Sequence, residues 1–244
     1  MAYNAPLALS LSPASGWIPI LDDIPKRSFA SYKPVALNYE LSRAYLDKCI
    51  NSLPWDRPIV RGSRLNRKAC WLTSSPCTCC YDYSGTSWPS NRFPPWMVDL
   101  TGIVSSLCGF NTLPNACNVN LYEGGSDAVG WHADDEDIFD AVRTPTTIVS
   151  LSLGCTRMFE FSPRDNSQAI TRIELGSGDL LTMEGLMQKH YLHRVPVQIA
   201  LDGIRVNVTW RWIVQHQAHC PIYASSVDVV DPSSNCRVWT SRAA

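Results

Sequence analysis

The second half of the chain, from residue 117 onward, is divided by turn residues into short strand-like runs. Short runs rich in β-branched and aromatic side chains, with turn signals between them, are typical of a β-sandwich or jelly roll. The runs fall at 117–122, 129–134, 146–153, 156–161, 170–175, 179–184, 190–195 and 205–214. This succession predicts a mainly β fold of the jelly-roll type.

Two helices are predicted ahead of this region. Apolar side chains recur at helical spacing over residues 39–53, and Pro54 ends that segment. Residues 95–109 begin with Pro95 and end with Gly109, which are favoured at the two ends of a helix. We expect both helices to pack against one of the sheets.

The length of 244 residues and the apolar content of 45% suit one large domain. We predict that this domain spans residues 37–215, with short strands and loops at 55–93. Residues 1–36 are rich in Pro and Ser and predict a loop-like N-terminal extension, and residues 216–244 predict a C-terminal tail. No apolar run is long enough for a transmembrane helix, so we expect no membrane partner.

The chain contains ten cysteines at irregular spacings. A chain of this length does not depend on disulfides, so we expect reduced thiols and a location in the nucleus or cytoplasm. One group of residues could form a zinc site: Cys77, Cys79, Cys80, His216, His219 and Cys220. Because their spacing fits no standard zinc motif, free thiols are the favoured interpretation.

The formal net charge of −1 excludes binding of nucleic acid through bulk positive charge. One local group of cations precedes residue 69 and comprises Arg57, Arg61, Arg64, Arg67 and Lys68. This group forms either a solvated basic loop or a patch that binds phosphates.

A histidine and a carboxylate stand two positions apart, at His132 and Asp134. Alternate residues of an extended segment share a face, so both side chains point the same way. A second histidine would complete a two-histidine, one-carboxylate site, which leaves coordination positions open and suits non-haem Fe(II). His190 and His193 lie three apart in one predicted strand, so only one of them can be that ligand. A solvated acidic turn is the alternative interpretation.

Residues 205–214 alternate between a polar face and an apolar face. The polar face holds Arg205, Asn207, Thr209 and Arg211, and the apolar face holds Val206, Val208, Trp210, Trp212 and Val214. The polar face either is solvated or lines a barrel that binds an acid, since arginine bonds both oxygens of a carboxylate. Asn120 and Tyr122, on one face of an earlier strand, add neutral donors.

These motifs, taken in order, resemble the AlkB family of Fe(II)/2-oxoglutarate-dependent dioxygenases over about residues 117–213. The matching segments are 120–122, His132-Ala133-Asp134-Asp135-Glu136, 150–154, 157–160, 178–185, 193–196 and 205–211. Upstream, 81–85 resembles the substrate lid of the family, and Arg67-Lys68 resembles the basic pair before it. The His-x-Asp-Asp-Glu form is most similar to the members that act on 1-methyladenine and 3-methylcytosine.

The resemblance implies a double-stranded β-helix with supporting N-terminal helices and a substrate lid within residues 55–93. It implies that Fe(II) is bound by His132, Asp134 and His193. The co-substrate 2-oxoglutarate would be held by Arg205 and Tyr122 at its far carboxylate and by Arg211, Asn120 and Asn207 near the metal. Substrate contacts are implied for Tyr81, Tyr83, Asp135, Glu136, Arg67 and Lys68, with Tyr83 stacked on the base and the acidic pair at its edge.

The implied function is oxidative demethylation of N-alkylated nucleobases in DNA or RNA by a monomer, with consumption of dioxygen and release of formaldehyde. Members that act on duplex DNA carry an aromatic finger before the basic pair, and Val60-Arg61-Gly62 lacks an aromatic residue here. This departure favours a single-stranded substrate. The alternatives are hydroxylation of a protein or small molecule, an inactive jelly roll that binds nucleic acid, and a purely structural β-sandwich.

Overall fold

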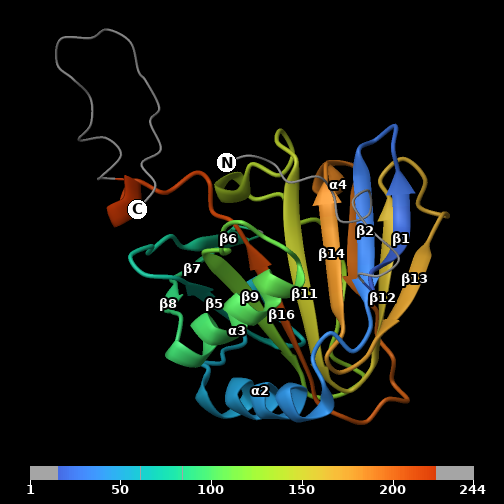
Figure 1. Cartoon of the computed structure of the whole chain (residues 1–244), viewed down its shortest axis with the longest axis horizontal. Helices are drawn as coiled ribbons and strands as arrows, with labels where there is room; N and C mark the ends of the chain where they lie inside the picture. Colours follow the sequence, from blue (N-terminus) through green and yellow to red (C-terminus); the bar gives the residue numbers. More distant parts are fainter. Residues whose placement is uncertain (1–15, 61, 84, 224–244) are drawn as a thin grey trace, which may run out of the picture.

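The computed structural model describes residues 16–60, 62–83 and 85–223, and it consists mainly of two β-sheets (Figure 1). The large sheet has the strand order β1-β2-β14-β11-β16-β9-β5-β8, and the small sheet has the order β10-β15-β12-β13. All pairs within these sheets are antiparallel except β5 and β8, which are parallel. The mainly β prediction is therefore confirmed.

The strands of the large sheet are β1 (Ile18–Asp23), β2 (Ser28–Lys33), β5 (Lys68–Thr73), β8 (Asn91–Arg92), β9 (Ala116–Tyr122), β11 (Thr146–Gly154), β14 (Leu180–Gly185) and β16 (Arg205–Arg211). Those of the small sheet are β10 (Val129–His132), β12 (Arg157–Pro163), β13 (Thr171–Leu175) and β15 (Tyr191–Val195). From β9 to β12, and again from β14 to β16, the chain passes back and forth between the sheets. This alternation is the connectivity expected of a jelly roll.

Two short hairpins lie beside the large sheet, formed by β3 (Ile59–Val60) with β4 (Ser63–Arg64), and by β6 (Tyr81–Tyr83) with β7 (Thr86–Trp88). The second hairpin, β6–β7, corresponds to the segment predicted as the lid. A 3-10 turn, η2 (Asp137–Phe139), and a one-turn helix, α4 (Met187–His190), lie between the strands.

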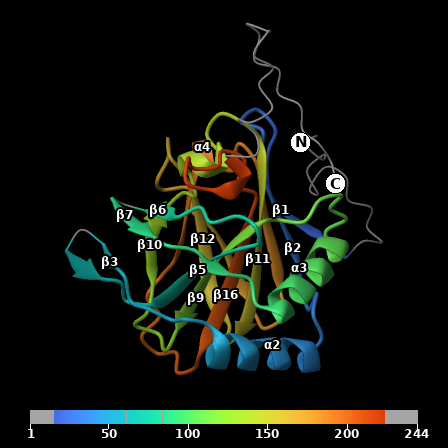
Figure 2. The ribbon, with the colours of Figure 1, turned by 90° about the vertical axis from the view of Figure 1, so that its left-hand side faces the viewer.

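The two predicted helices, α2 (Tyr39–Ser52) and α3 (Pro95–Leu107), pack against one face of the large sheet (Figure 2). The apolar residues of β16 face them, as the alternation predicts, and Trp210 donates its indole N–H to Thr101 of α3 at 2.9 Å. The opposite face of β16 therefore points into the space between the sheets, where its arginines and its asparagine are buried. No described helix has the length and apolar character needed to cross a bilayer.

Each of the eight predicted runs contains a strand, but the prediction of a loop-like N-terminus was wrong for residues 18–33. These residues form β1 and β2, and β2 joins the large sheet through β14. The first four residues of β2 are all buried, including Ser28 and Ser31. Small hydroxyl side chains fit this tightly covered strand, whereas in the sequence they are typical of a turn. Residues 1–15 lie outside the described part.

We predict that Leu100→Ala in α3 lowers the free energy of unfolding by about 2–5 kcal/mol, since Leu100 is fully buried between helix and sheet. Val98→Ala in the same helix is the matched control, because Val98 is 49% exposed and should change stability far less. Urea denaturation of both variants measures the difference. Equal losses of stability would contradict the described packing of α3.

Candidate active site

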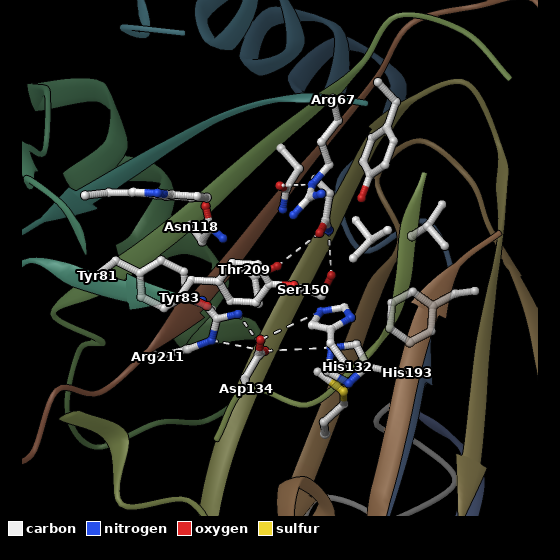
Figure 3. A pocket seen from close by; sticks show the side chains of 18 residues that line it. Arg67, Tyr81, Tyr83, Asn118, His132, Asp134, Ser150, His193, Thr209 and Arg211 are labelled. Atoms are coloured by element: carbon white, nitrogen blue, oxygen red, sulfur yellow. Dashed lines mark hydrogen bonds and ion pairs between the residues drawn. The ribbon is translucent and has the colours of Figure 1, made fainter. Parts of the chain in front are cut away.

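A polar cavity lies between the two sheets, beneath the β6–β7 hairpin (Figure 3). The polar face of β16 and the neighbouring strand β9 supply much of its wall, since Asn207 pairs with Asn120 and Arg205 pairs with Tyr122 in register. The small sheet contributes the opposite wall, with His132 on β10 and His193 on β15. The cavity therefore brings together side chains from segments far apart in the sequence.

The antiparallel pairing of β10 with β15 places His132 directly opposite His193, and their ring centroids lie 4.2 Å apart. Asp134 follows β10, and its two carboxylate oxygens each lie 3.9 Å from the Nε2 atom of one of these histidines. The candidate donor atoms of the three residues all lie within 4.8 Å of one another. His190 lies instead at the end of α4, outside this group.

The surroundings of this triad keep all three donors available. Burial lowers the pKa of His193 to about 3, with repulsion from His132 as the next cause, so its ring is neutral at pH 7. Burial tends to raise the pKa of Asp134, but Arg211 and the two histidines outweigh burial and lower it to about 2. The Nδ1 atom of His132 lies 2.8 Å from the carbonyl oxygen of Gly130, which leaves Nε2 directed at Asp134.

Arg211 joins the polar face of β16 to the triad. Its Nη2 atom lies 2.5 Å from the Oδ2 atom of Asp134, and its Nε atom donates to the same oxygen at 3.1 Å. Its guanidinium carbon lies 5.9 Å from the ring centroid of Tyr81 and 5.3 Å from that of Phe139. The remaining nitrogen, Nη1, is buried and has no hydrogen-bond partner among the described residues.

Arg205, six residues earlier on the same face, is fully buried, and only part of its guanidinium is satisfied. Its Nη2 atom donates to Ser152 Oγ at 2.8 Å, while Nε and Nη1 have no hydrogen-bond partner in the described part of the chain. The guanidinium lies 5.2 Å from the ring centroid of Tyr122, which lines the cavity, although Arg205 itself does not. A buried cation with two unpaired nitrogens destabilises the folded state unless an anion binds to it.

The two predicted asparagine donors lie between these arginines, and each has a partner. Asn120 accepts a hydrogen bond from Arg67 Nε at 2.6 Å. Asn207 donates to Ser150 Oγ at 2.6 Å and accepts from Thr209 Oγ1 at 3.0 Å. Arg67 is itself buried and lines the cavity, so it is positioned to face a ligand there and not a phosphate on the surface.

The β6–β7 hairpin covers the cavity with an aromatic cluster. Tyr81 stacks on Trp71 with a centroid separation of 4.8 Å and on Tyr83 with one of 6.0 Å. Trp88 lies edge-on to Tyr81 at 5.7 Å. Tyr81 lines this cavity alone, whereas Tyr83 lines both this cavity and the open groove next to it.

That groove, which we call the outer groove, meets the cavity at Tyr83 and His132. Besides His132, the charged residues of its lining are one arginine, Arg164, and four acidic residues. The acidic residues are Asp82, Asp135, Glu136 and Asp137. The indole of Trp131 forms another part of the wall. The guanidinium of Arg194 packs over this indole in a cation–π contact, 4.4 Å from the ring centroid. The groove is therefore both acidic and aromatic.

Asp135 and Glu136 were predicted to act as a pair, but their side chains have separate partners. Asp135 is exposed and forms an ion pair with Arg164 at 2.9 Å. Glu136 accepts a hydrogen bond from the Tyr81 hydroxyl at 2.7 Å and so connects the start of η2 to the β6–β7 hairpin. Burial raises the pKa of Glu136 to about 7, with the charge of Asp134 as the next cause.

The predicted group of five cations does not form one described basic surface. Arg67 is buried, while Lys68 and Arg57 both form ion pairs with Glu123, at 2.8 and 2.6 Å. Arg64 is exposed on β4, and Arg61 lies outside the described residues. The partial neutralisation by Glu123 leaves less charge for phosphates than the sequence indicates.

Two residues of this region were missed in the sequence analysis, one beside the triad and one in the wall of the outer groove. Gln188 is buried and accepts a hydrogen bond from the backbone N–H of Asp134 at 2.9 Å, which fixes the position of the carboxylate. Trp131 lines the outer groove beside His132 because the register of β10 shifts between Val129 and His132. Strict alternation would place Trp131 on the opposite face, so the sequence carried no signal for it.

The residues present fit both a metal ion and a dicarboxylate. Two neutral imidazoles and one carboxylate form a donor set that suits non-haem Fe(II) and leaves positions open. The unpaired nitrogens of Arg205 and Arg211 offer separate sites for the two ends of a short diacid.

A sequence model of the 2OG-Fe(II) oxygenase superfamily matches residues 30–211. DNA oxidative demethylase ALKBH2 of Arabidopsis thaliana is 32% identical over 212 residues, which cover 73% of this chain and 64% of that protein. Alpha-ketoglutarate-dependent dioxygenase alkB homolog 3 of Homo sapiens is 33% identical over 183 residues, which cover 69% of this chain and 60% of that protein. The chain thus spans about half to two thirds of the length of these curated relatives.

Among solved structures, that of OsALKBH1 superposes with a TM-score of 0.54 at 20% identity, covering 75% of this chain and 96% of that one. This likeness supports the fold. The match over residues 30–211 and the relatives together show that the chain belongs to the 2OG-Fe(II) oxygenase superfamily and, within it, to the AlkB family, whose cofactors are Fe(II) and 2-oxoglutarate.

Proposed function

We propose that the protein is an Fe(II)/2-oxoglutarate-dependent dioxygenase that demethylates N-alkylated nucleobases, with 1-methyladenine and 3-methylcytosine in single strands as preferred substrates. The observation that carries the proposal is the buried triad of His132, Asp134 and His193 beside two incompletely paired arginines. The relatives named as a DNA oxidative demethylase and as alkB homolog 3 support the same class of activity.

In the overall reaction, one oxygen atom of dioxygen enters a C–H bond of the N-methyl group, and the other enters succinate as 2-oxoglutarate loses carbon dioxide. The hydroxymethyl product then releases formaldehyde and leaves the unmodified base. Bound Fe(II) and 2-oxoglutarate supply the oxidising chemistry, and the protein aims it at the methyl group.

Each end of the co-substrate has a proposed partner, one lining the cavity and one buried beside it. Arg205, with Tyr122 beside it, binds the carboxylate far from the metal, because two of its nitrogens lack partners among the described residues and it lies six residues before Arg211, the partner of Asp134. Arg211 binds the end of 2-oxoglutarate near the metal, because it contacts Asp134 and its Nη1 atom has no partner among the described residues. Asn120, Asn207 and Arg67 line the cavity between them.

The outer groove supports a cationic methylated base as substrate. Methylation at N1 of adenine or N3 of cytosine gives the base a positive charge, which the acidic lining of the groove favours over a neutral base. Tyr83 provides an aromatic surface for the base where the groove meets the triad. Because the base must leave its stack to reach the buried triad, a single strand costs less to bind than a duplex.

The decisive experiment incubates the protein with Fe(II), 2-oxoglutarate and oligonucleotides carrying 1-methyladenine, 3-methylcytosine or 6-methyladenine, in DNA and in RNA. Mass spectrometry of the digested products should show loss of methyl from the two cationic bases, fastest in single strands, and little from 6-methyladenine. Absence of demethylation on all of these substrates would contradict the proposed activity. Faster turnover of 6-methyladenine would contradict the proposed selectivity.

We predict that His193→Ala abolishes both Fe(II) binding and demethylation, because it removes one of the three metal donors. His190→Ala is the matched control and should retain both, since His190 lies at the end of α4, outside the triad. Isothermal titration under anaerobic conditions measures the metal binding. If His193→Ala binds Fe(II) as tightly as the unmodified chain, the assignment of the triad is wrong.

For the co-substrate, we predict that Arg205→Met raises the KM for 2-oxoglutarate by about tenfold to a hundredfold, the usual cost of losing hydrogen bonds to a charged group. The substitution keeps the side-chain volume and removes a buried charge, so the fold should persist. Arg143→Met, at an exposed arginine paired with Asp140, is the control. An unchanged KM for Arg205→Met would assign the far carboxylate to another residue.

For the nucleobase, we predict that Tyr83→Leu raises the KM for methylated oligonucleotides by about fivefold to a hundredfold, since stacking of a base on an aromatic ring is worth ~1–3 kcal/mol. The KM for 2-oxoglutarate should stay constant. Tyr39→Leu, at an exposed tyrosine of α2, controls for general effects. Equal KM values for the oligonucleotide in Tyr83→Leu and the unmodified chain would argue against stacking at this position.

A further inference from the structure

Four metal-binding side chains meet outside the candidate active site, at the base of the β6–β7 hairpin. Cys77 and Cys79 lie between β5 and β6, and His216 and Cys220 lie in the segment that follows β16. Their donor atoms are all within 4.8 Å of one another, and the three cysteines are buried. We propose that these four residues form a structural zinc site.

The distances between the donor atoms match those around a tetrahedral zinc ion. Bonds of ~2.3 Å to sulfur and ~2.0 Å to nitrogen place two sulfurs about 3.8 Å apart and a sulfur about 3.5 Å from the nitrogen. The His216 Nδ1 atom lies 3.6 Å from Cys77 Sγ, 3.4 Å from Cys79 Sγ and 3.5 Å from Cys220 Sγ. The sulfurs of Cys77 and Cys220 are 3.8 Å apart.

A disulfide is a poor alternative, since its sulfurs would be about 2.0 Å apart. Three thiols and an imidazole favour zinc over the hard cations Mg²⁺ and Ca²⁺, which bind oxygen. A closed set of four protein ligands, with no position left for water, is typical of structural zinc and not of catalytic zinc. In addition, the backbone N–H of Gln217 donates to Cys79 Sγ at 3.4 Å, a contact that supports a metal-bound thiolate.

The two remaining candidates from the sequence, Cys80 and His219, lie beside the site but do not complete it. The Nε2 atom of His219 lies 3.9 Å from Cys80 Sγ and 3.0 Å from the carbonyl oxygen of Thr78. Sequence spacing therefore gave six candidates, and the fold selects four of them. Cys80 provides a matched control, because it is adjacent to Cys79 and half-buried.

The proposed ion fixes the base of the hairpin that carries Tyr81 and Tyr83. Gln217 reinforces the same junction, since it accepts from the backbone N–H of Cys80 at 2.7 Å and donates to Asp82 at 2.9 Å. The zinc site would thus position the aromatic cover of the cavity without contact with the iron or the substrate. This last role rests on the proposed function, whereas the site itself does not.

The test measures zinc by plasma mass spectrometry in the full chain purified with reducing agent. It uses His193→Ala as background, so that metal at the triad cannot contribute. We expect one equivalent of zinc in this background, its loss on addition of Cys79→Ser, and its retention on addition of Cys80→Ser. Absence of zinc from the His193→Ala protein, or equal zinc in both double variants, would overturn the proposal.

Replacement of the ion with Co²⁺ gives a second readout that needs no cysteine variant to fold. Three thiolate ligands should produce a strong thiolate-to-cobalt absorption in the near ultraviolet and the visible bands of a tetrahedral ion, in both the unmodified chain and His193→Ala. The triad contains no sulfur and cannot produce the thiolate band. Its absence from both proteins after full exchange would also overturn the proposal, whatever the enzymatic activity.

Discussion

The ion pair between Arg211 and Asp134 joins the two sheets at the centre of the cavity. Arg211 belongs to β16 of the large sheet, and Asp134 follows β10 of the small sheet. Both groups are buried, so the charge of each is stabilised mainly by the other and by the groups around it. The pair keeps the carboxylate ionised, with its two oxygens near the two histidines.

Much of the fold could be predicted from the sequence, because the relevant signals are local. Alternation in residues 205–214 correctly separated the face that packs against α2 and α3 from the face that lines the cavity. The helices were evident from their spacing and from Pro95. The strands at residues 18–33 were missed, since their burial depends on pairing with β14, a strand about 150 residues away.

The candidate site shows the same division between local and long-range information. His132 and Asp134 could be paired from their spacing, whereas His193 was chosen over His190 only through the resemblance to the AlkB family. In the structure, the pairing of β10 with β15 brings His193 to them. Gln188 and Trp131 had no readable signal, because one acts through a backbone hydrogen bond and the other depends on a shift of strand register. The sequence spacing of the cysteines and histidines likewise argued against a metal site at Cys77 and Cys79. The other two side chains of that cluster, His216 and Cys220, lie about 140 residues later, after β16.

The position of the segment after β16 affects how this domain should be delimited. The superfamily model ends at residue 211, where the last donor of the cavity lies. Residues 216–220 nevertheless contact the base of the β6–β7 hairpin through His216, Gln217 and Cys220. A recombinant fragment cut at the end of the superfamily match would keep every residue of the triad and lose these contacts with the hairpin. The packed domain therefore extends beyond the segment that the superfamily model matches, since Ile213 and Cys220 belong to a buried cluster.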